Sequence, residues 1–116
     1  MGSFEELVVW RKAHEAGLRA YTITKLLPAD EKYGLISQMR RAAVSIATNI
    51  VEGQERPSPG DFAHFIDISI GSAAELRYLL ILVRDLGYVS DGDIASLSSD
   101  LAGLIRMLRT FRNSRE

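Results

Sequence analysis

The sequence contains no cysteine and only three prolines among its 116 residues. Without cysteine the chain forms no disulfide, has no thiolate nucleophile and offers no cysteine-based metal site. Long hydrophobic runs are also missing, since the longest strongly apolar stretch, residues 79–83, is far shorter than a membrane-spanning helix requires. These absences argue against a disulfide-stabilised fold and against a membrane span.

Neither sign of charge dominates the sequence. The 14 Lys and Arg residues oppose 15 Asp and Glu residues, so the formal net charge is −1. This near-neutral balance argues against a protein whose whole surface binds nucleic acid. No apolar stretch typical of a secretory signal follows Met1, because Glu5 and Glu6 come almost at once. We therefore expect a soluble, cytoplasmic protein that does not associate with membranes.

The prolines divide the chain into helical segments. An apolar fraction of 47% is ordinary for a globular protein, and the length suits a single domain over residues 1–116. Pro28, Pro57 and Pro59 lie at apparent boundaries, residues 87–93 form another break, and the pattern between the breaks is helical. We predict helices at about 4–26, 30–53, 59–86 and 91–112. Short connections between long helices predict an all-α, antiparallel up-down-up-down four-helix bundle.

The first predicted helix has a start signal and a clear set of bulky apolar residues. Ser3 and Glu6 fit a capping box, in which each side chain binds an otherwise unsatisfied backbone N–H. Gly17, in the middle, costs about 1 kcal/mol relative to alanine and suggests the close approach of another backbone. The expected apolar face consists of Phe4, Leu7, Trp10, Leu18 and Tyr21.

Glycines and capping residues mark the ends of the next two helices. We expect the second helix to end at Gly53, because glycine tolerates the left-handed conformation found just after a helix. Ser58 followed by Pro59 is typical of a helix start, and Gly87 of the following stop.

The fourth helix has the most regular pattern. Ser90 with Asp93 is expected to cap it. Apolar residues then recur at spacings of three and four, which is the seam of helices that pack at roughly 20°. This seam consists of Ile94, Leu97, Leu101, Leu104, Leu108 and Phe111.

The helix at 30–53 is more apolar than a bundle helix needs to be. At about 100° per residue, its polar stripe spans an arc of about 80° and its apolar residues spread over roughly 200°. An apolar arc of about 100° is enough to face one core. We therefore expect this helix to contact more than the inside of its own bundle. The polar stripe consists of Gln38, Arg41, Ser45, Asn49 and Glu52.

The polar stripe has two interpretations, a solvated face or a polar network at a subunit interface. Arg40 falls within the apolar arc, and a buried arginine must be paired. Glu75, near Ser72 in the next helix, is a plausible partner for Arg40 or Arg41 because arginine binds carboxylates through two parallel hydrogen bonds. The candidate interface or buried network consists of Arg40, Arg41, Ser45, Asn49, Glu52, Ser72 and Glu75.

The sequence offers little support for an enzyme. A di-iron bundle needs paired Glu-x-x-His motifs, and the two histidines, His14 and His64, provide none. Ser45 and Ser72 have no evident base, and no glycine-rich phosphate-binding loop is present. We expect no catalytic residue, no metal and no cofactor.

Three segments carry a family resemblance: WRKAHEAGLRAY, EKYGLISQMRRAAVSIATNIVEG and GDFAHFIDISIGSAAELRYLL. They resemble the four-helix-bundle family first named for open reading frames within 23S rRNA intervening sequences. The resemblance implies a ring-shaped homo-oligomer, typically a pentamer, with no established enzymatic activity. A related group of the same fold serves as the basic accessory proteins of diversity-generating retroelements, which are thought to bind a reverse transcriptase and nucleic acid. This near-neutral sequence departs from that group in charge.

Four arginines near the C-terminus allow an alternative function. Cations at a helix C-terminus favour the helix dipole, but in a ring several copies of such a tip would form a phosphate-binding patch. The possible nucleic-acid contacts are Arg106, Arg109, Arg112 and Arg115. We expect a non-enzymatic, self-assembling scaffold or adaptor. The alternative is a nucleic-acid-binding accessory factor that acts with a reverse transcriptase or an rRNA-related element.

Overall fold

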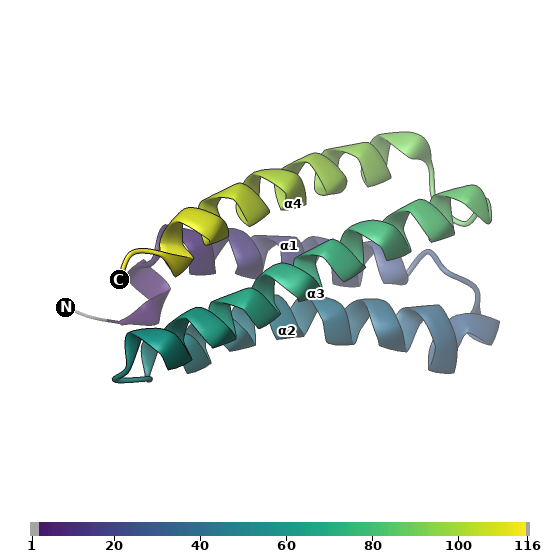
Figure 1. Ribbon diagram of the computed structural model, residues 1–116. Coiled ribbons are helices and arrows are strands. Elements are labelled where there is room, and N and C mark those ends of the chain that lie inside the picture. Colours follow the sequence, from purple (N-terminus) through teal and green to yellow (C-terminus); the bar gives the residue numbers. More distant parts are fainter. Residues whose placement is uncertain (1–2, 116) are drawn as a thin grey trace.

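The computed structural model describes residues 3–115, and this part of the chain contains α-helices and no strand. It measures 44 × 24 × 22 Å along its principal axes. The prediction of an all-α fold with four helices is confirmed (Figure 1). The α-helices are α1 (Val8–Thr24), α2 (Ser37–Gln54), α3 (Pro59–Asp85) and α4 (Asp91–Arg112). One short helical segment, η1 (Phe4–Glu6), precedes α1, and two more, η2 (Ala29–Glu31) and η3 (Lys32–Ile36), precede α2.

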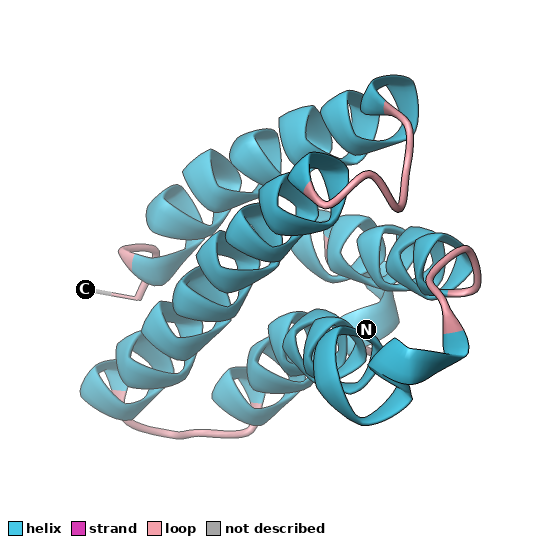
Figure 2. Ribbon diagram, turned by 90° about the vertical axis from the view of Figure 1, so that its right-hand side faces the viewer, coloured by secondary structure: helices cyan, strands magenta, loops and turns pink. Residues whose placement is uncertain are grey.

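The four α-helices lie alongside one another. The connections between α1 and α2 and between α3 and α4 lie at one end of the molecule, and the connection between α2 and α3 lies at the other (Figure 1). The contact between α2 and α3 is the most extensive, and α1 contacts both α2 and α4. The view along the helices shows the short connections at the ends of the bundle (Figure 2).

Each helix turns one row of apolar side chains into a common core. On α4 the predicted seam from Ile94 to Leu108 is buried, and Phe111 packs against the core. The apolar face predicted for the first helix is only partly correct: Leu7 and Trp10 pack against the core, whereas the side chains of Leu18 and Tyr21 are 58% and 39% exposed. A row dominated by alanine faces the core instead, since small side chains let α1 approach its neighbours closely. This row consists of Val9, Ala13, Ala16, Ala20 and Ile23.

The first predicted helix is divided in two. Leu7 adopts an extended conformation, with φ −72° and ψ 130°, so η1 ends before α1 begins. The hydroxyl of Ser3 accepts a hydrogen bond from the Glu5 N–H, at 3.2 Å, rather than from the Glu6 N–H as the capping box predicted. Ser3 therefore caps a single turn, and α1 starts without a side-chain cap.

The second helix begins and ends later than predicted. Gly34, with φ −108° and ψ −109°, interrupts the helical geometry, so that α2 begins only at Ser37. At the other end Gly53 is helical and buried, and α2 continues to Gln54. A side-chain carbon at Gly53 would lie 3.2 Å from the Ile66 Cδ1 atom. Gly53 is needed for close packing of α2 on α3, and the prediction that it stops the helix was wrong.

The ends of α3 follow the sequence signals closely. The Ser58 hydroxyl accepts a hydrogen bond from the Asp61 N–H at 3.0 Å, and Pro59 occupies the first turn. At the C-terminus, Gly87 has φ 80°, its N–H donates to the Arg84 carbonyl, and the Tyr88 N–H donates to the Val83 carbonyl. These two bonds form a Schellman motif, which satisfies the last carbonyls of the helix.

Candidate functional site

An apolar groove runs along the surface between α1 and α2. We call it the α1–α2 groove; it has a volume of about 380 Å³. Its walls include Leu18 from α1 and Val44 from α2, which is exposed by 50% of its surface. Leu18 belongs to the apolar pattern predicted for the first helix, and Val44 belongs to the wide apolar arc of the second. The two patterns therefore meet at one place on the surface.

The floor of the α1–α2 groove is made of small residues. Ala13 and Gly17 lie one turn apart on α1, and Ala43 and Ala47 lie one turn apart on α2. No atom lies within 4 Å of the position that a side-chain carbon on Gly17 would occupy. Within the described chain, Gly17 therefore makes no close backbone approach, contrary to expectation, and the space above it is open. Small residues at such a position allow another helix to come near.

Aromatic side chains line one wall of the groove. Trp10 stacks on His14, with 4.9 Å between ring centroids and an interplanar angle of 8°, and Phe4 packs edge-on against Trp10. The guanidinium of Arg40 lies 4.5 Å from the centroid of the Tyr21 ring. These rings give the groove a rigid apolar surface. Covering it would fix few side-chain rotamers and so cost little conformational entropy.

Arg40 is paired, but not with a carboxylate. Its Nε atom donates a hydrogen bond to the Thr24 hydroxyl at 2.9 Å, and its charge lies over Tyr21. The expected pairing of Arg40 or Arg41 with Glu75 does not form in the described chain, where Glu75, on α3, accepts a hydrogen bond from Gln38 at 3.4 Å. A cation–π contact and a neutral hydroxyl replace the predicted ion pair.

Part of the predicted polar network forms between α2 and α3. The hydroxyls of Ser45 and Ser72 lie 2.7 Å apart, and the Asn49 side-chain amide donates to the Ser45 hydroxyl at 3.0 Å and to the Ser45 carbonyl at 2.8 Å. Glu52 lies outside this network and pairs with Arg56, one turn along the helix, at 3.1 Å. Arg41 is exposed, and among residues 3–115 it has no carboxylate partner.

The four C-terminal arginines fall into two pairs. Arg112 donates to the Asp67 carboxylate at 2.6 Å. Arg115 donates to the side chain of Gln54 at 2.9 Å, and its guanidinium lies 4.2 Å from the centroid of the Phe62 ring. Arg106 and Arg109 are exposed. Half of the predicted basic tip therefore attaches the end of α4 to α2 and α3.

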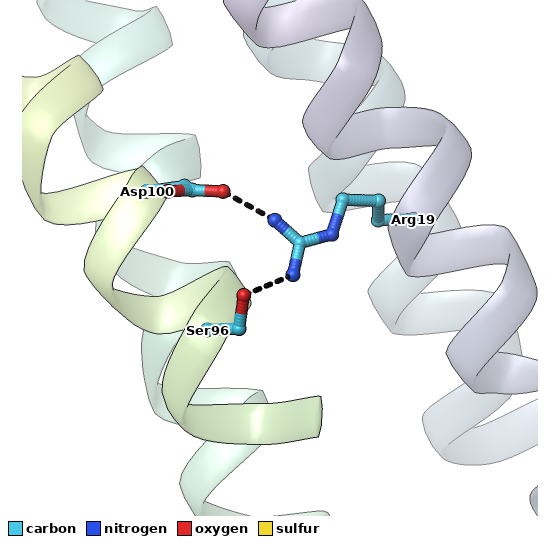
Figure 3. A network of polar contacts seen from close by, with 3 residues as sticks. All are labelled: Arg19, Ser96 and Asp100. Carbon is cyan, nitrogen blue, oxygen red and sulfur yellow. Dashed lines mark hydrogen bonds and ion pairs between the residues drawn. The ribbon is translucent and has the colours of Figure 1, made fainter. Parts of the chain in front are cut away.

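A second, more polar groove of about 420 Å³ lies between α1 and α4. Arg19 spans it, donating one hydrogen bond to the Asp100 carboxylate and another to the Ser96 hydroxyl at 2.8 Å (Figure 3). Lys12 and Arg106 line the same groove. The sequence did not reveal this contact, because Arg19 and Asp100 lie far apart along the chain.

The metal-ligating side chains of the described part of the chain form no cluster in the fold. Between residues 3 and 115, no three histidine, aspartate or glutamate side chains gather closely enough to hold a metal ion. His14 and His64 are both exposed, and each lies against an aromatic ring. No helix in this part of the chain combines the length and the hydropathy required to cross a bilayer.

Comparison with known proteins supports the resemblance seen in the sequence. The family model described as 23S rRNA-intervening sequence protein matches residues 5–110. A solved structure from Bacteroides thetaiotaomicron, of a protein with unknown function from the S23 ribosomal protein family, is similar to this chain with a TM-score of 0.84 and 26% identity. The similarity covers 92% of this chain and 100% of that one. No curated protein matches the sequence.

Proposed function

The chain belongs to the 23S rRNA-intervening sequence protein family, and from this premise we propose that it is a non-enzymatic scaffold or adaptor that works as a homo-oligomer. In this proposal antiparallel helical bundles assemble into a ring in the cytoplasm, a pentamer by the family resemblance. The observation that carries the proposal is the α1–α2 groove, whose apolar side chains are left exposed beside a floor of small residues.

The physical argument is that water disfavours this surface. Burying apolar area stabilises an assembly by about 25 cal/mol per Å². Leu18 and Val44 expose about half of their surface and stand on either side of the same groove, whereas isolated exposed apolar residues need no explanation. A neighbouring molecule that covers the groove would remove both side chains from water at once.

The polar side chains next to the groove support the proposal for a different reason. Ser45, Asn49 and Ser72 satisfy one another inside the monomer, so their role in assembly is to shape the α2–α3 surface. Arg41 has a free guanidinium fork within the described chain, and it lies between the polar network and the groove. We propose that Arg41 contributes to the subunit interface directly.

Size-exclusion chromatography with light scattering tests this function. We expect the wild type to elute as a multiple of the 12.9 kDa chain at micromolar concentration. Leu18→Lys with Val44→Lys should reduce it to a monomer, because two charges would have to be buried in an apolar groove. Leu26→Lys is the matched control, since Leu26 is 57% exposed and lies outside the groove. A monomeric wild type would contradict the proposal.

A second candidate function is nucleic-acid binding, and the exposed cations Lys12, Arg106 and Arg109 favour it. Several copies in a ring would repeat these charges and bind phosphates with strong salt dependence. Labelled RNA should then bind at low salt and lose binding when Arg106 and Arg109 are changed to alanine. Absence of binding at about 50 mM salt would contradict this alternative, because phosphate contacts are strongest there.

A further inference from the structure

A hollow of about 350 Å³ adjoins the α1–α2 groove and shares Tyr21, Val44 and Thr48 with it. We call it the arginine hollow, because two consecutive arginines of α2 line it. Among the described residues no Asp or Glu belongs to its lining, which therefore carries two positive charges and no negative one. Its polar lining consists of Tyr21, Arg40, Arg41, Ser45, Thr48 and Asn49.

Neutral groups hold Arg40 in place. Its Nε atom donates to the Thr24 hydroxyl at 2.9 Å, and its guanidinium lies 4.5 Å from the centroid of the Tyr21 ring. Thr24 is only 1% exposed, and its hydroxyl donates to the Tyr21 carbonyl at 2.8 Å, so the acceptor is itself fixed. Within residues 3–115 the two terminal amino groups of Arg40 have no hydrogen-bond partner. Arg40 thus presents a fixed fork of unused donors, which suits two oxygens of one anion.

Arg41 adds a second positive charge without an ion pair. It is exposed, and no carboxylate of the described chain pairs with it. Glu75 lines a neighbouring hollow together with Arg41, but it accepts a hydrogen bond from Gln38 instead. Glu52 forms its ion pair one turn further along α2. An anion in the arginine hollow would offset the repulsion between the two like charges of Arg40 and Arg41.

The α1–α4 groove is cationic in a different way. Lys12, Arg19 and Arg106 line it, but so do Glu15 and Asp100, and Arg19 is bound to Asp100. Its positive charges are therefore largely balanced by the chain itself. The arginine hollow has no such acidic residue in its lining, which makes it the better place for an external anion.

We propose that the arginine hollow binds a phosphate group. The fork of Arg40 and the guanidinium of Arg41 contact its oxygens, and the Thr48 hydroxyl, which has no partner within the described chain, donates a further hydrogen bond. A doubly charged phosphate matches two arginines, whereas a single carboxylate would leave one charge unbalanced. All of these residues belong to one copy of the chain, so the inference does not require the proposed assembly.

Titration calorimetry with inorganic phosphate tests the site. The titration is done at low, constant ionic strength and mildly alkaline pH, where inorganic phosphate carries two negative charges. We expect a dissociation constant of about 1 mM or tighter, weakened by added sodium chloride. Arg40→Gln and Arg41→Gln should each weaken binding by about tenfold, because each removes one charged donor group. Circular dichroism checks that the variants are folded.

Arg77→Gln is the matched control. The Arg77 Nε atom also donates to a serine hydroxyl, Ser98 at 3.3 Å, but Arg77 lies on α3 outside the arginine hollow. This variant should bind phosphate like the wild type. An equal loss in Arg77→Gln would show that binding follows the overall charge, and it would overturn the site. Acetate that binds as tightly as phosphate would overturn the preference for a doubly charged group.

A second titration separates the two sources of a phosphate group, small phosphorylated molecules and RNA. Its probe is an RNA oligonucleotide without a terminal phosphate, so that every phosphate in it is a singly charged diester. Tighter binding of inorganic phosphate than of this RNA supports a small ligand. Tighter binding of the RNA, lost in Arg40→Gln and Arg41→Gln, supports the same site with RNA as its ligand. Binding of neither probe would overturn the proposal.

Thr24→Val tests whether the fork of Arg40 is positioned in advance. Valine has the shape of threonine but cannot accept the bond from Arg40, and the charge of the site is unchanged. We expect phosphate to bind about threefold more weakly, because the guanidinium must then be ordered on binding. Unchanged affinity in the folded variant would contradict the positioning by Thr24 on which the proposal rests.

Light scattering of the same samples distinguishes this inference from the proposed function. A monomeric wild type that binds phosphate through Arg40 and Arg41 would overturn the proposed assembly and support the phosphate site. A wild-type oligomer that binds neither phosphate nor RNA would overturn the phosphate site and support the proposed assembly.

Discussion

Tyr88, between α3 and α4, binds Glu31 of the short segment η2. Its hydroxyl donates a hydrogen bond to the Glu31 carboxylate at 3.1 Å. This hydrogen bond is the main cause that raises the pKa of Tyr88, and partial burial and the negative charges of Glu31 and Asp30 act in the same direction. A raised pKa means that folding favours the neutral phenol. The contribution to stability is fully present below the ordinary tyrosine pKa of about 10 and is lost as pH rises through the higher folded value.

We predict that the Tyr88 hydroxyl ionises above pH 10, roughly, in the folded protein. Ultraviolet difference titration of the wild type against Tyr88→Phe isolates this group. Glu31→Ala should bring its ionisation back toward the ordinary value, because the acceptor and its charge are removed. A Tyr88 midpoint at or below the ordinary value would contradict the contact.

Gly53 and Gly103 both lie inside helices but in different surroundings. At Gly53 a side-chain carbon would meet Ile66 at 3.2 Å and Phe65 at 3.4 Å, whereas at Gly103 it would meet only the flexible end of Arg106, at 3.7 Å. We expect Gly103→Ala to stabilise the fold by about 0.5–1 kcal/mol through helix propensity, and Gly53→Ala to destabilise it by about 1 kcal/mol through overpacking. Urea unfolding at one protein concentration compares them. Equal stabilisation by both would show that α2 and α3 are not closely packed at Gly53.

At the scale of the helices, α3 and α4 start with serines that behave differently. The Ser58 hydroxyl accepts a hydrogen bond from the backbone of α3, whereas the Ser90 hydroxyl makes no cap bond to the backbone of α4 and instead donates to the Asp93 carboxylate at 3.4 Å. Ser58→Ala should therefore cost about 1 kcal/mol of stability, and Ser90→Ala clearly less. Chemical unfolding of the two variants measures the difference. A larger loss for Ser90→Ala would contradict the assignment of the caps.

Sequence patterns predicted α3 and α4 well because their signals are local. The Ser58–Pro59 start, the glycine stop at Gly87 and the heptad seam of α4 each depend on neighbours along the chain. The core face of the first helix was predicted only in part: Trp10 packs against the core, but Leu18 is exposed and alanines such as Ala13 face the core instead. Whether an alanine is buried depends on how closely another helix approaches. The apolar pattern of a single helix does not contain that information.

The candidate site could be predicted only in outline. The wide apolar arc of the second helix includes Val44, which is exposed in the groove, but the contact with another molecule expected from this arc stays a prediction. The groove also needs α1, whose Gly17 and Leu18 lie on its other side. The long-range pairs Arg112–Asp67 and Arg19–Asp100 were not predicted. Each pair joins residues that only the folded bundle brings together. Because Arg112 pairs with Asp67, counting the charges of the C-terminal segment alone overestimated its basic character.

At the scale of the whole molecule, long-range ion pairs join helices that lie far apart along the chain. Arg19 of α1 pairs with Asp100 of α4, and Arg112 of α4 pairs with Asp67 of α3. The lining of the α1–α2 groove, in contrast, is mostly apolar and includes no Asp or Glu. The proposed assembly would remove this groove from water.

The central claim is that this chain assembles through the α1–α2 groove. Sedimentation equilibrium of the wild type and of the Leu18→Lys, Val44→Lys variant, over a series of micromolar concentrations, tests it most directly. The account predicts a wild-type mass several times 12.9 kDa and a variant mass close to 12.9 kDa. A wild type that remains at 12.9 kDa throughout the series, or a variant that keeps the wild-type mass, would contradict it.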